Sequence, residues 1–116
     1  MKRVLLLTGV ILATAAAPVL AHHALNAQYD TRQTVTLKGT ITKVEWSNPH
    51  GRMFLHTMND TGKMDWNLEM ASPNILFLNG LNVDTLRKGD YVIVEAYAAK
   101  NGSTSGYATK VTVTTH

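Results

Sequence analysis

The fold is decided by residues 72–80, which read Ser-Pro-Asn-Ile-Leu-Phe-Leu-Asn-Gly. Serine is a favoured N-cap, and proline is favoured at the first helical position because its missing N–H would have no partner there. The apolar run that follows is closed by an Asn-Gly pair, which is a common way to end a helix. These signals predict a short helix near residues 73–79.

Three segments before this helix are predicted to be strands. Residues 64–70 alternate most clearly, with apolar side chains on one face and polar side chains on the other. Residues 35–41 alternate as well, and the alternation slips after Ile41, which predicts a β-bulge near Thr42-Lys43. Residues 52–58 carry apolar groups on both faces. A polar turn joins them to residues 64–70 as a hairpin.

Two more strands are predicted after the helix, at residues 91–97 and 107–114, with a loop rich in Gly, Ser and Asn between them. On the last strand we expect Tyr107, Thr109, Val111 and Val113 to share one face. The residues expected to be largely buried are Val35, Leu37, Ile41, Trp66, Leu68, Val92, Val94, Val111 and Val113.

The predicted order is three strands, a helix and two strands. This order matches the OB-fold, a partly open five-stranded Greek-key barrel. An SH3-like barrel is the competing architecture, and it would not require a capped helix between the third and fourth strands. We therefore predict a mainly β, small five-stranded OB-fold-like barrel with one short helix between strands 3 and 4.

The N-terminal segment, residues 1–21, is predicted to be a signal peptide. Lys2 and Arg3 precede a mostly apolar run, and Val19 and Ala21 are small residues at positions −3 and −1 of a cleavage site. The apolar run is shorter than the roughly 20 residues that a membrane-spanning helix needs. We expect cleavage after Ala21, export to the periplasm, no stable membrane span afterwards, and a single domain at residues 22–116.

Composition narrows the function classes. The chain has no cysteine, so disulfides, thiolate metal sites and thiol catalysis are excluded. Without Lys2 and Arg3, nine of the eleven basic residues remain against eight acidic ones, which gives a net charge of +1. No basic run is longer than Arg87-Lys88, so the charge predicts no nucleic acid among the partners. A metal ion or an envelope protein is the partner that we expect.

The first strand is expected to end in a corner at residues 46–50, which read Trp-Ser-Asn-Pro-His. Proline fixes its own φ angle and restricts the residue before it, so His50 should be held at a stiff bend. Trp46 and Asn48 are the candidate ligand-binding residues at this corner. Trp46 could form a recognition face with Tyr97 or Tyr107.

Several motifs together resemble a known family. They are His22-His23 after an alanine, the corner at residues 46–50, Trp66, Ser-Pro-Asn at residues 72–74 and the turn at residues 87–90. In these features the chain is similar to a family of small exported bacterial proteins grouped as a domain of unknown function. The resemblance implies a periplasmic, barrel-like domain, and it implies no established activity.

Histidines are the candidate metal ligands. After cleavage, His22 would offer an α-amine and an imidazole to one metal ion, a donor set that favours copper, and His23 could serve instead. His50 and His56 are candidates for a further imidazole. The alternatives are a solvated tail for His22-His23, a carbonyl hydrogen bond at the corner for His50, and a half-buried structural role for His56. The methionines are better explained by core packing than by a copper(I) site.

Catalysis is not expected. The carboxylates of the mature chain are scattered, and Asp65 and Glu69 would lie roughly 13 Å apart along one strand, too far for a paired acid and base. Two function classes remain. One is a periplasmic copper-binding protein that uses the N-terminal and corner histidines. The alternative is an OB-fold ligand- or protein-interaction module without metal.

Overall fold

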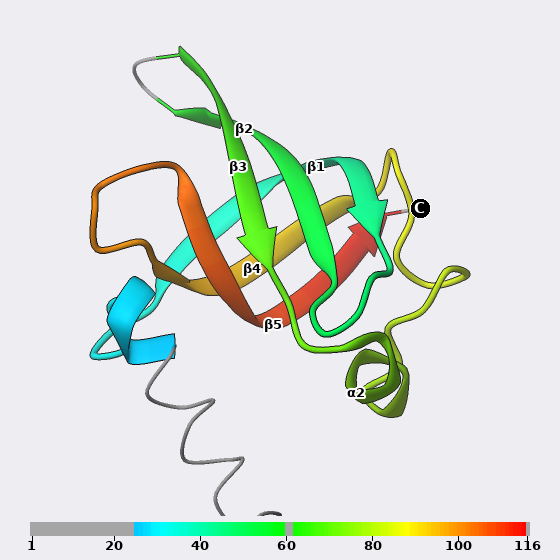
Figure 1. Ribbon diagram of the computed structural model, residues 1–116. Helices are drawn as coiled ribbons and strands as arrows, with labels where there is room; N and C mark the ends of the chain where they lie inside the picture. The colour runs from blue at the N-terminus through cyan, green and yellow to red at the C-terminus, as the bar shows by residue number, and fades with distance from the viewer. Residues whose placement is uncertain (1–24, 60–61, 116) are drawn as a thin grey trace, which may run out of the picture.

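Within the described residues, a helical turn at residues 25–28 is followed by five strands and a short helix in the order predicted from the sequence. They are β1 (Val35–Glu45), β2 (Arg52–Asn59), β3 (Gly62–Glu69), α2 (Pro73–Leu78), β4 (Tyr91–Ala98) and β5 (Ser105–Thr115). The computed structural model describes residues 25–59 and 62–115 (Figure 1). Its strands close into a barrel in the order β1-β2-β3-β5-β4, which confirms the predicted OB-fold-like architecture.

The first strand is long because it pairs with two neighbours. Its first half, Val35–Thr40, pairs with β4, and Gly39–Glu45 pairs with β2. Gly39 belongs to both ladders, and a Cβ atom there would collide with the backbone carbonyl of His56. The register shifts between Ile41 and Lys43, so the predicted bulge is confirmed.

Helix α2 forms where the sequence predicts it. The Ser72 hydroxyl accepts a hydrogen bond from the backbone N–H of Ile75, and Pro73 begins the helix. Asn79 is the C-cap, and Gly80 follows with a φ of 81°. Leu76 is the buried residue of the helix and joins the barrel core. The helix therefore lies against one end of the barrel (Figure 1).

The turn before β4 is tied to the bulge of β1. The buried carboxylate of Asp90 accepts a hydrogen bond from the backbone N–H of Arg87 over 2.9 Å. Gly89 adopts a φ of 94°, a region that favours glycine. The backbone of Ile41 donates to the carbonyl of Asp90 and accepts from Gly89. This turn therefore fixes where β4 begins relative to β1.

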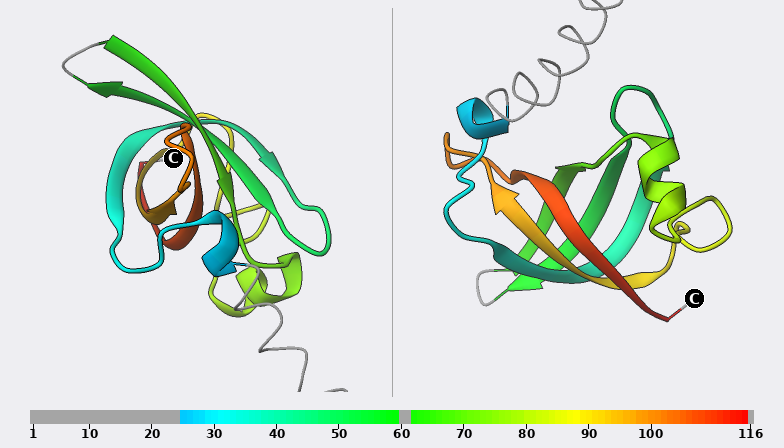
Figure 2. Two further views of the ribbon diagram at one scale, coloured as in Figure 1. Left: turned by 60° about the vertical axis from the view of Figure 1, so that its left-hand side comes forward. Right: turned by 90° about the horizontal axis from the view of Figure 1, so that it is seen from below.

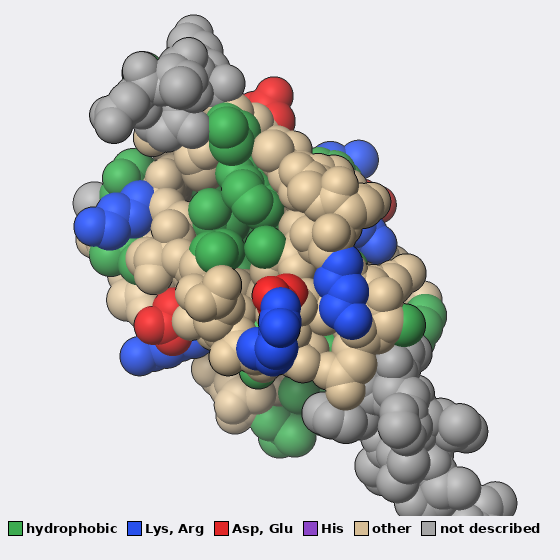
Figure 3. Space-filling model, turned by 90° about the vertical axis from the view of Figure 1, so that its left-hand side faces the viewer, with side chains coloured by type: hydrophobic (Ala, Val, Ile, Leu, Met, Phe, Trp, Pro, Cys, Tyr) green, Lys and Arg blue, Asp and Glu red, His purple; other side chains and the backbone are tan. Residues whose placement is uncertain are grey.

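The core is formed by side chains from β1, β2, β3, β4 and α2 and from the segments next to β3 and β4. It consists of Ile41, Met53, Leu55, Leu68, Met70, Leu76, Leu86, Val92, Val94 and Ala96. Of the residues expected inside, four are buried, and Val35, Leu37, Trp66, Val111 and Val113 are only partly buried. Strands β3 and β5 pair over three residues, so the barrel wall is short there. Figure 3 shows a cluster of hydrophobic side chains on the surface of one face of the molecule.

The prediction for the faces of β5 is wrong at its first half. The register shifts between Glu95 and Ala96, and Thr109 is an extra residue between Ala108, which pairs with Ala96, and Lys110, which pairs with Glu95. Such a bulge reverses the faces that follow it. Thr109 is exposed, whereas Val111 is partly buried.

Within the described ranges, no helix is long and apolar enough to cross a membrane.

Candidate functional site

The outer faces of β1, β2 and β3 form one continuous surface with Phe54 near its middle. Strand alternation turns Met53 and Leu55 into the core and leaves Phe54 half-buried on the outside. Lys43 is paired across from Phe54 in the ladder, and its Nζ lies 5.6 Å from the centroid of the Phe54 ring. The pair thus combines an aromatic ring with a cation, within the range of a cation–π contact.

Arg52 follows on the same face, two residues before Phe54. Its Nη1 donates a hydrogen bond to Oδ1 of Asn67 over 2.8 Å, and its Nη2 lies 3.9 Å from Oε1 of Glu69. The Arg52 side chain is 38% exposed and that of Glu69 is 18% exposed. The guanidinium is therefore held in place by β3 and still reaches solvent.

Beyond Arg52 lies a cavity of about 480 Å³, which we call the arm cavity. Its walls come from the chain before β1, the start of β2, the end of β3 and the loop before β5. It is lined by Ala27, Gln28, Tyr29, Arg52, Glu69, Ala99, Lys100, Asn101, Ser103 and Ser105. Hydrogen-bonding groups dominate this lining.

The segment before β1, residues 25–34, which we call the arm, is bound to the barrel by hydrogen bonds. The backbone of Asp30 donates to the carbonyl of Ala98, and that of Lys100 donates to the carbonyl of Gln28. The Asp30 carboxylate accepts hydrogen bonds from the side chain and the backbone of Arg32, and these lower its pKa from 3.8 to about 2. The arm therefore has a fixed path along the cavity.

Tyr29 and Tyr107 connect the arm cavity with the corner. Their ring centroids are 6.0 Å apart, and the Tyr107 ring lies 6.3 Å from that of His50. Burial raises the pKa of Tyr29 above 10.0, and the Glu69 carboxylate, which accepts a hydrogen bond from the Tyr29 hydroxyl, raises it further. Burial and Glu69 also raise the pKa of Tyr107. Both hydroxyls therefore lose their protons at a higher pH in the folded chain than in the unfolded chain.

The structure separates the two described histidine candidates. Nδ1 of His50 lies 2.9 Å from the carbonyl oxygen of Met70, so this nitrogen carries the proton and Nε2 is left for another partner. Nδ1 of His56 lies 2.8 Å from Oδ1 of Asp65. Six residues of extended chain span about 20 Å, too far for one metal ion to bind both imidazoles. His22 and His23 lie outside the described residues.

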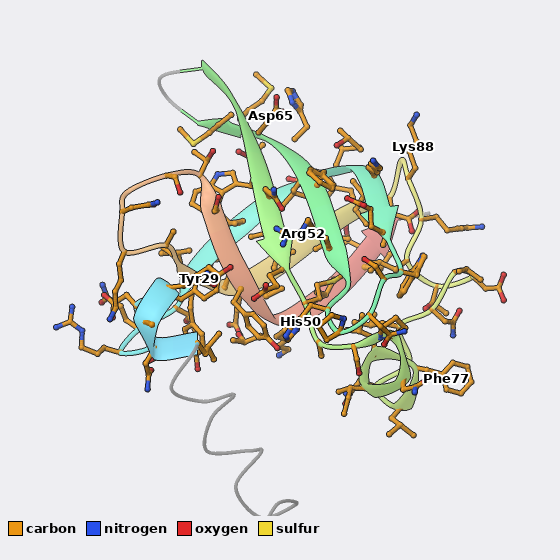
Figure 4. All side chains as sticks on the ribbon, in the orientation of Figure 1. Tyr29, His50, Arg52, Asp65, Phe77 and Lys88 are labelled. Carbon is orange, nitrogen blue, oxygen red and sulfur yellow. The ribbon has the colours of Figure 1, made fainter. Side chains whose placement is uncertain are left out.

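Trp46 and Asn48, the two candidate ligand-binding residues of the corner, do not lie on the surface around Phe54. Trp46 lines a cavity of about 380 Å³ beside α2, with Phe77 and Val83 among its walls. Tyr97 and Tyr107 line a different cavity. Asn48 is exposed and precedes Pro49 through a cis peptide bond. Figure 4 shows Tyr29, His50 and Arg52 on the barrel side of the molecule and Phe77 pointing away from it.

Sequence reasoning missed Lys43, Phe54, Arg52 and Tyr29 as members of a site. One signal could have found two of them, Arg52 and Phe54. In an OB-fold, the faces of strands 2 and 3 and the loops after strands 1 and 4 carry oligonucleotides and oligosaccharides. Alternation along β2 already placed Phe54 on the face opposite Met53, and that face is the one that binds ligands in this architecture. Tyr29 carried no such signal.

Comparisons with known proteins agree with the fold. A family model described as "Family of unknown function (DUF6152)" matches residues 9–109, which confirms the predicted resemblance to a family of unknown function. No curated protein sequence matches the chain. The chain is similar to crystal structures of Rim1, the mitochondrial single-stranded DNA-binding protein of Saccharomyces cerevisiae. Forms 1 and 2 align with 20% identity and a TM-score of 0.55, covering 72% of this chain and 94% and 95% of theirs.

One prediction about partners is corrected by this comparison. The sequence predicted no nucleic acid because the mature chain is nearly neutral. The similar structures are single-stranded DNA-binding proteins, so that exclusion does not stand. Net charge is a sum over the whole surface, and a ligand meets only one face of it. At 20% identity, the likeness to Rim1 shows the fold alone.

Proposed function

We propose that the chain, which belongs to the DUF6152 family, is an OB-fold binding protein that takes a single-stranded nucleic acid across β1, β2 and β3. The observation that carries the proposal is the row formed by Lys43, Phe54 and Arg52. It offers a ring on which a base can stack and two cations on either side of it. Single-stranded nucleic acid supplies stacking rings and phosphates in alternation. Binding without catalysis is part of the proposal.

The arm cavity extends this row at one end. Arg52 lines the cavity and belongs to the row, so a strand that passes Phe54 would reach the hydroxyl and amide groups beside Tyr29. Hydrogen bonds from such neutral groups fix the path of a chain and add little dependence on salt. The two parts together favour a ligand that is extended rather than globular.

The test is fluorescence anisotropy with a labelled oligothymidine of about twelve nucleotides, a length within the usual site size of one OB-fold. We expect Phe54→Ala to weaken binding roughly 5- to 150-fold, because stacking on one ring contributes about 1–3 kcal/mol. Phe77→Ala is the matched control, since Phe77 is an exposed phenylalanine on α2, away from this face. The control should bind like the unmodified protein.

The dependence of the affinity on salt concentration measures how many phosphates the two cations contact. Contacts of Lys43 and Arg52 with two phosphates predict a slope of about −1.4 for log affinity against log salt. Lys43→Ala should reduce it to about −0.7. No binding by the unmodified protein, or equal binding by the Phe54 and Phe77 variants, would reject the proposal. If the protein bound a neutral oligosaccharide through Phe54 and did not bind the oligonucleotide, its ligand would be an oligosaccharide and not a nucleic acid.

Copper is the second candidate, and the surroundings of His50 favour it. The Tyr107 ring contacts both the His50 ring and the ring of Tyr29, which lies seven residues after His22 in the sequence. The Nδ1–H of His50 is held by a carbonyl, the arrangement that leaves Nε2 oriented for a metal. Export and cleavage before His22 belong to this candidate, because the free α-amine would be a ligand.

Copper(II) titration tests the second candidate. Protein that begins at His22, its start checked by intact mass, is compared with protein that carries one extra residue before His22. The candidate predicts tighter binding by the first, and weaker binding by the His50→Gln variant of it. His56→Gln is the control variant. Affinity should fall as the pH drops below the roughly 6.5 of free imidazole, since protons compete for the donors. Equal affinity with and without the extra residue would exclude the amine as a ligand.

A further inference from the structure

The cavity lined by Tyr97 and Tyr107 has a volume of about 590 Å³ and lies between α2 and β5. Figure 2 shows these two elements in the view from below. We call this cavity the α2–β5 groove. It is lined by Met70, Ala71, Ile75, Leu76, Asn79, Leu81, Tyr97, Tyr107, Ala108, Thr109, Lys110 and Val111. The lining differs from that of the arm cavity, and none of the residues of the proposed nucleic-acid row contributes to it.

One wall of this groove is the edge of a strand. The ladder between β3 and β5 ends at Glu69 and Tyr107. Beyond that point β5 continues to Thr115 and pairs with β4 along one of its edges. Among the described residues, no backbone hydrogen bond joins the other edge of residues 108–115 to any segment. That edge presents backbone donors and acceptors, which is the usual template for an added strand.

The opposite wall is apolar. Met70 and Leu76 are buried at its base, and Ile75 is 51% exposed beside them. Lys110 is the charged residue of the lining. A groove with an open strand edge on one side and a helix on the other can bind an extended peptide as an extra strand, with alternate side chains entering the groove.

We propose that residues 110–114 of β5 bind an extended peptide by strand addition. The peptide places apolar side chains against Ile75 and Leu76 and carries an acidic residue near Lys110. The bulge at Thr109 lies two residues after Tyr107, the last residue that pairs with β3. Bulges end one pairing and redirect the strand, so this one marks where the added strand begins. The volume of the groove lies within the roughly 300–1,000 Å³ usual for ligand sites.

The probe is a synthetic peptide of alternating valine and glutamate, about nine residues long, the length of a typical strand. Its ends are acetylated and amidated. Binding is followed by backbone amide shifts of isotope-labelled protein, and we expect the shifts to centre on residues 110–114, with slower amide exchange there. Two further peptides carry N-methyl groups, one on all valines and the other on all glutamates. An added strand donates from alternate residues, so one methylated peptide should lose binding and the other should keep it.

Charge reversal supplies the second readout. Lys110→Glu should weaken binding of the valine–glutamate peptide roughly two- to fivefold, the range for an exposed ion pair. The same variant should bind a valine–lysine peptide more tightly. Lys100→Glu, in the loop before β5, is the matched control and should change neither. No shift at residues 110–114 up to millimolar peptide, or equal binding of both methylated peptides and the unmodified one, would overturn strand addition. A urea midpoint equal to that of the unmodified protein would show that the variant is folded.

Discussion

Oδ1 of Asn67 holds Nη1 of Arg52 at 2.8 Å, across the ladder between β3 and β2. The two residues are not directly opposite each other, since Arg52 is paired with Glu69. The guanidinium therefore leans along the strands, between the carboxylate of Glu69 and the amide of Asn67. This diagonal contact gives a flexible side chain a fixed direction on the proposed binding face.

Asn67→Leu should weaken oligothymidine binding roughly two- to tenfold, because Arg52 loses the partner that orients it. The leucine keeps the approximate volume of the side chain and removes its acceptor. Fluorescence anisotropy at fixed salt measures the effect. Thr112→Ala, exposed on β5, is the control and should leave the affinity unchanged. An unchanged affinity in Asn67→Leu would mean that Arg52 does not need this contact to act.

Gly39→Ala should destabilise the protein by about 1–3 kcal/mol, the usual cost of forcing extra atoms into a packed place. The new Cβ would meet the carbonyl of His56, and the backbone of β2 cannot move without disturbing its ladders with β1 and β3. Urea denaturation measures the change. Lys38→Ala, at the neighbouring exposed position, is the control. Equal midpoints for the two variants would show that β1 and β2 are farther apart than the structure indicates.

Asp90→Ala should lower the free energy of unfolding by about 1–3 kcal/mol, because the backbone N–H of Arg87 loses its acceptor. Asp90→Asn should cost less, since an amide oxygen can still accept that hydrogen bond. The comparison separates the hydrogen bond from the charge. Urea denaturation at neutral pH gives both values, and a loss in Asp90→Asn as large as in Asp90→Ala would assign the effect to the charge.

Stability should fall in alkaline solution through Tyr29 and Tyr107. Their folded pKa values lie above the unfolded value of 10.0, so each contributes stability that is fully present below pH 10. That contribution is lost as the pH rises through the folded pKa values. The double variant Tyr29→Phe, Tyr107→Phe should therefore show a flatter decline above pH 10.

Urea midpoints between about pH 8 and pH 11 measure this dependence. Tyr91→Phe is the control, because Tyr91 lies at the start of β4 and far along the chain from the Glu69 cluster. The same slope in the double variant and the unmodified protein would show that the two tyrosines do not carry the alkaline loss.

Local patterns predicted the architecture because each depends on residues that are near in sequence. The cap formed by Ser72 and Pro73 placed α2, and alternation gave the inward face of β3 correctly. It assigned no inward face to β2, because that strand carries apolar groups on both faces. The slip after Ile41 placed the bulge of β1. The bulge at Thr109 was missed because a threonine fits either face, so the residues 107–113 still read as one unbroken alternation.

The candidate site was predicted less well than the fold. His50 was expected either to form a hydrogen bond with a carbonyl or to be a metal ligand. Its Nδ1 does form a hydrogen bond with the carbonyl of Met70, and its Nε2 is not used by that bond. Trp46, expected beside Tyr97 or Tyr107, lines a separate cavity. No contact was predicted for residues 25–34, and the structure holds this segment against the barrel through hydrogen bonds from Asp30 to Ala98 and from Lys100 to Gln28.

The sequence by itself determined the order of the strands, the position of the helix and the inner face of most strands, because propensity, capping and alternation act over a few residues. Only the tertiary structure decided that Lys43 lies over Phe54, that Arg52 is shared between Asn67 and Glu69, and that Tyr29 reaches the end of β3. Those neighbours depend on register and on barrel closure. A shift of one residue in either would exchange every outward contact while leaving the local patterns intact.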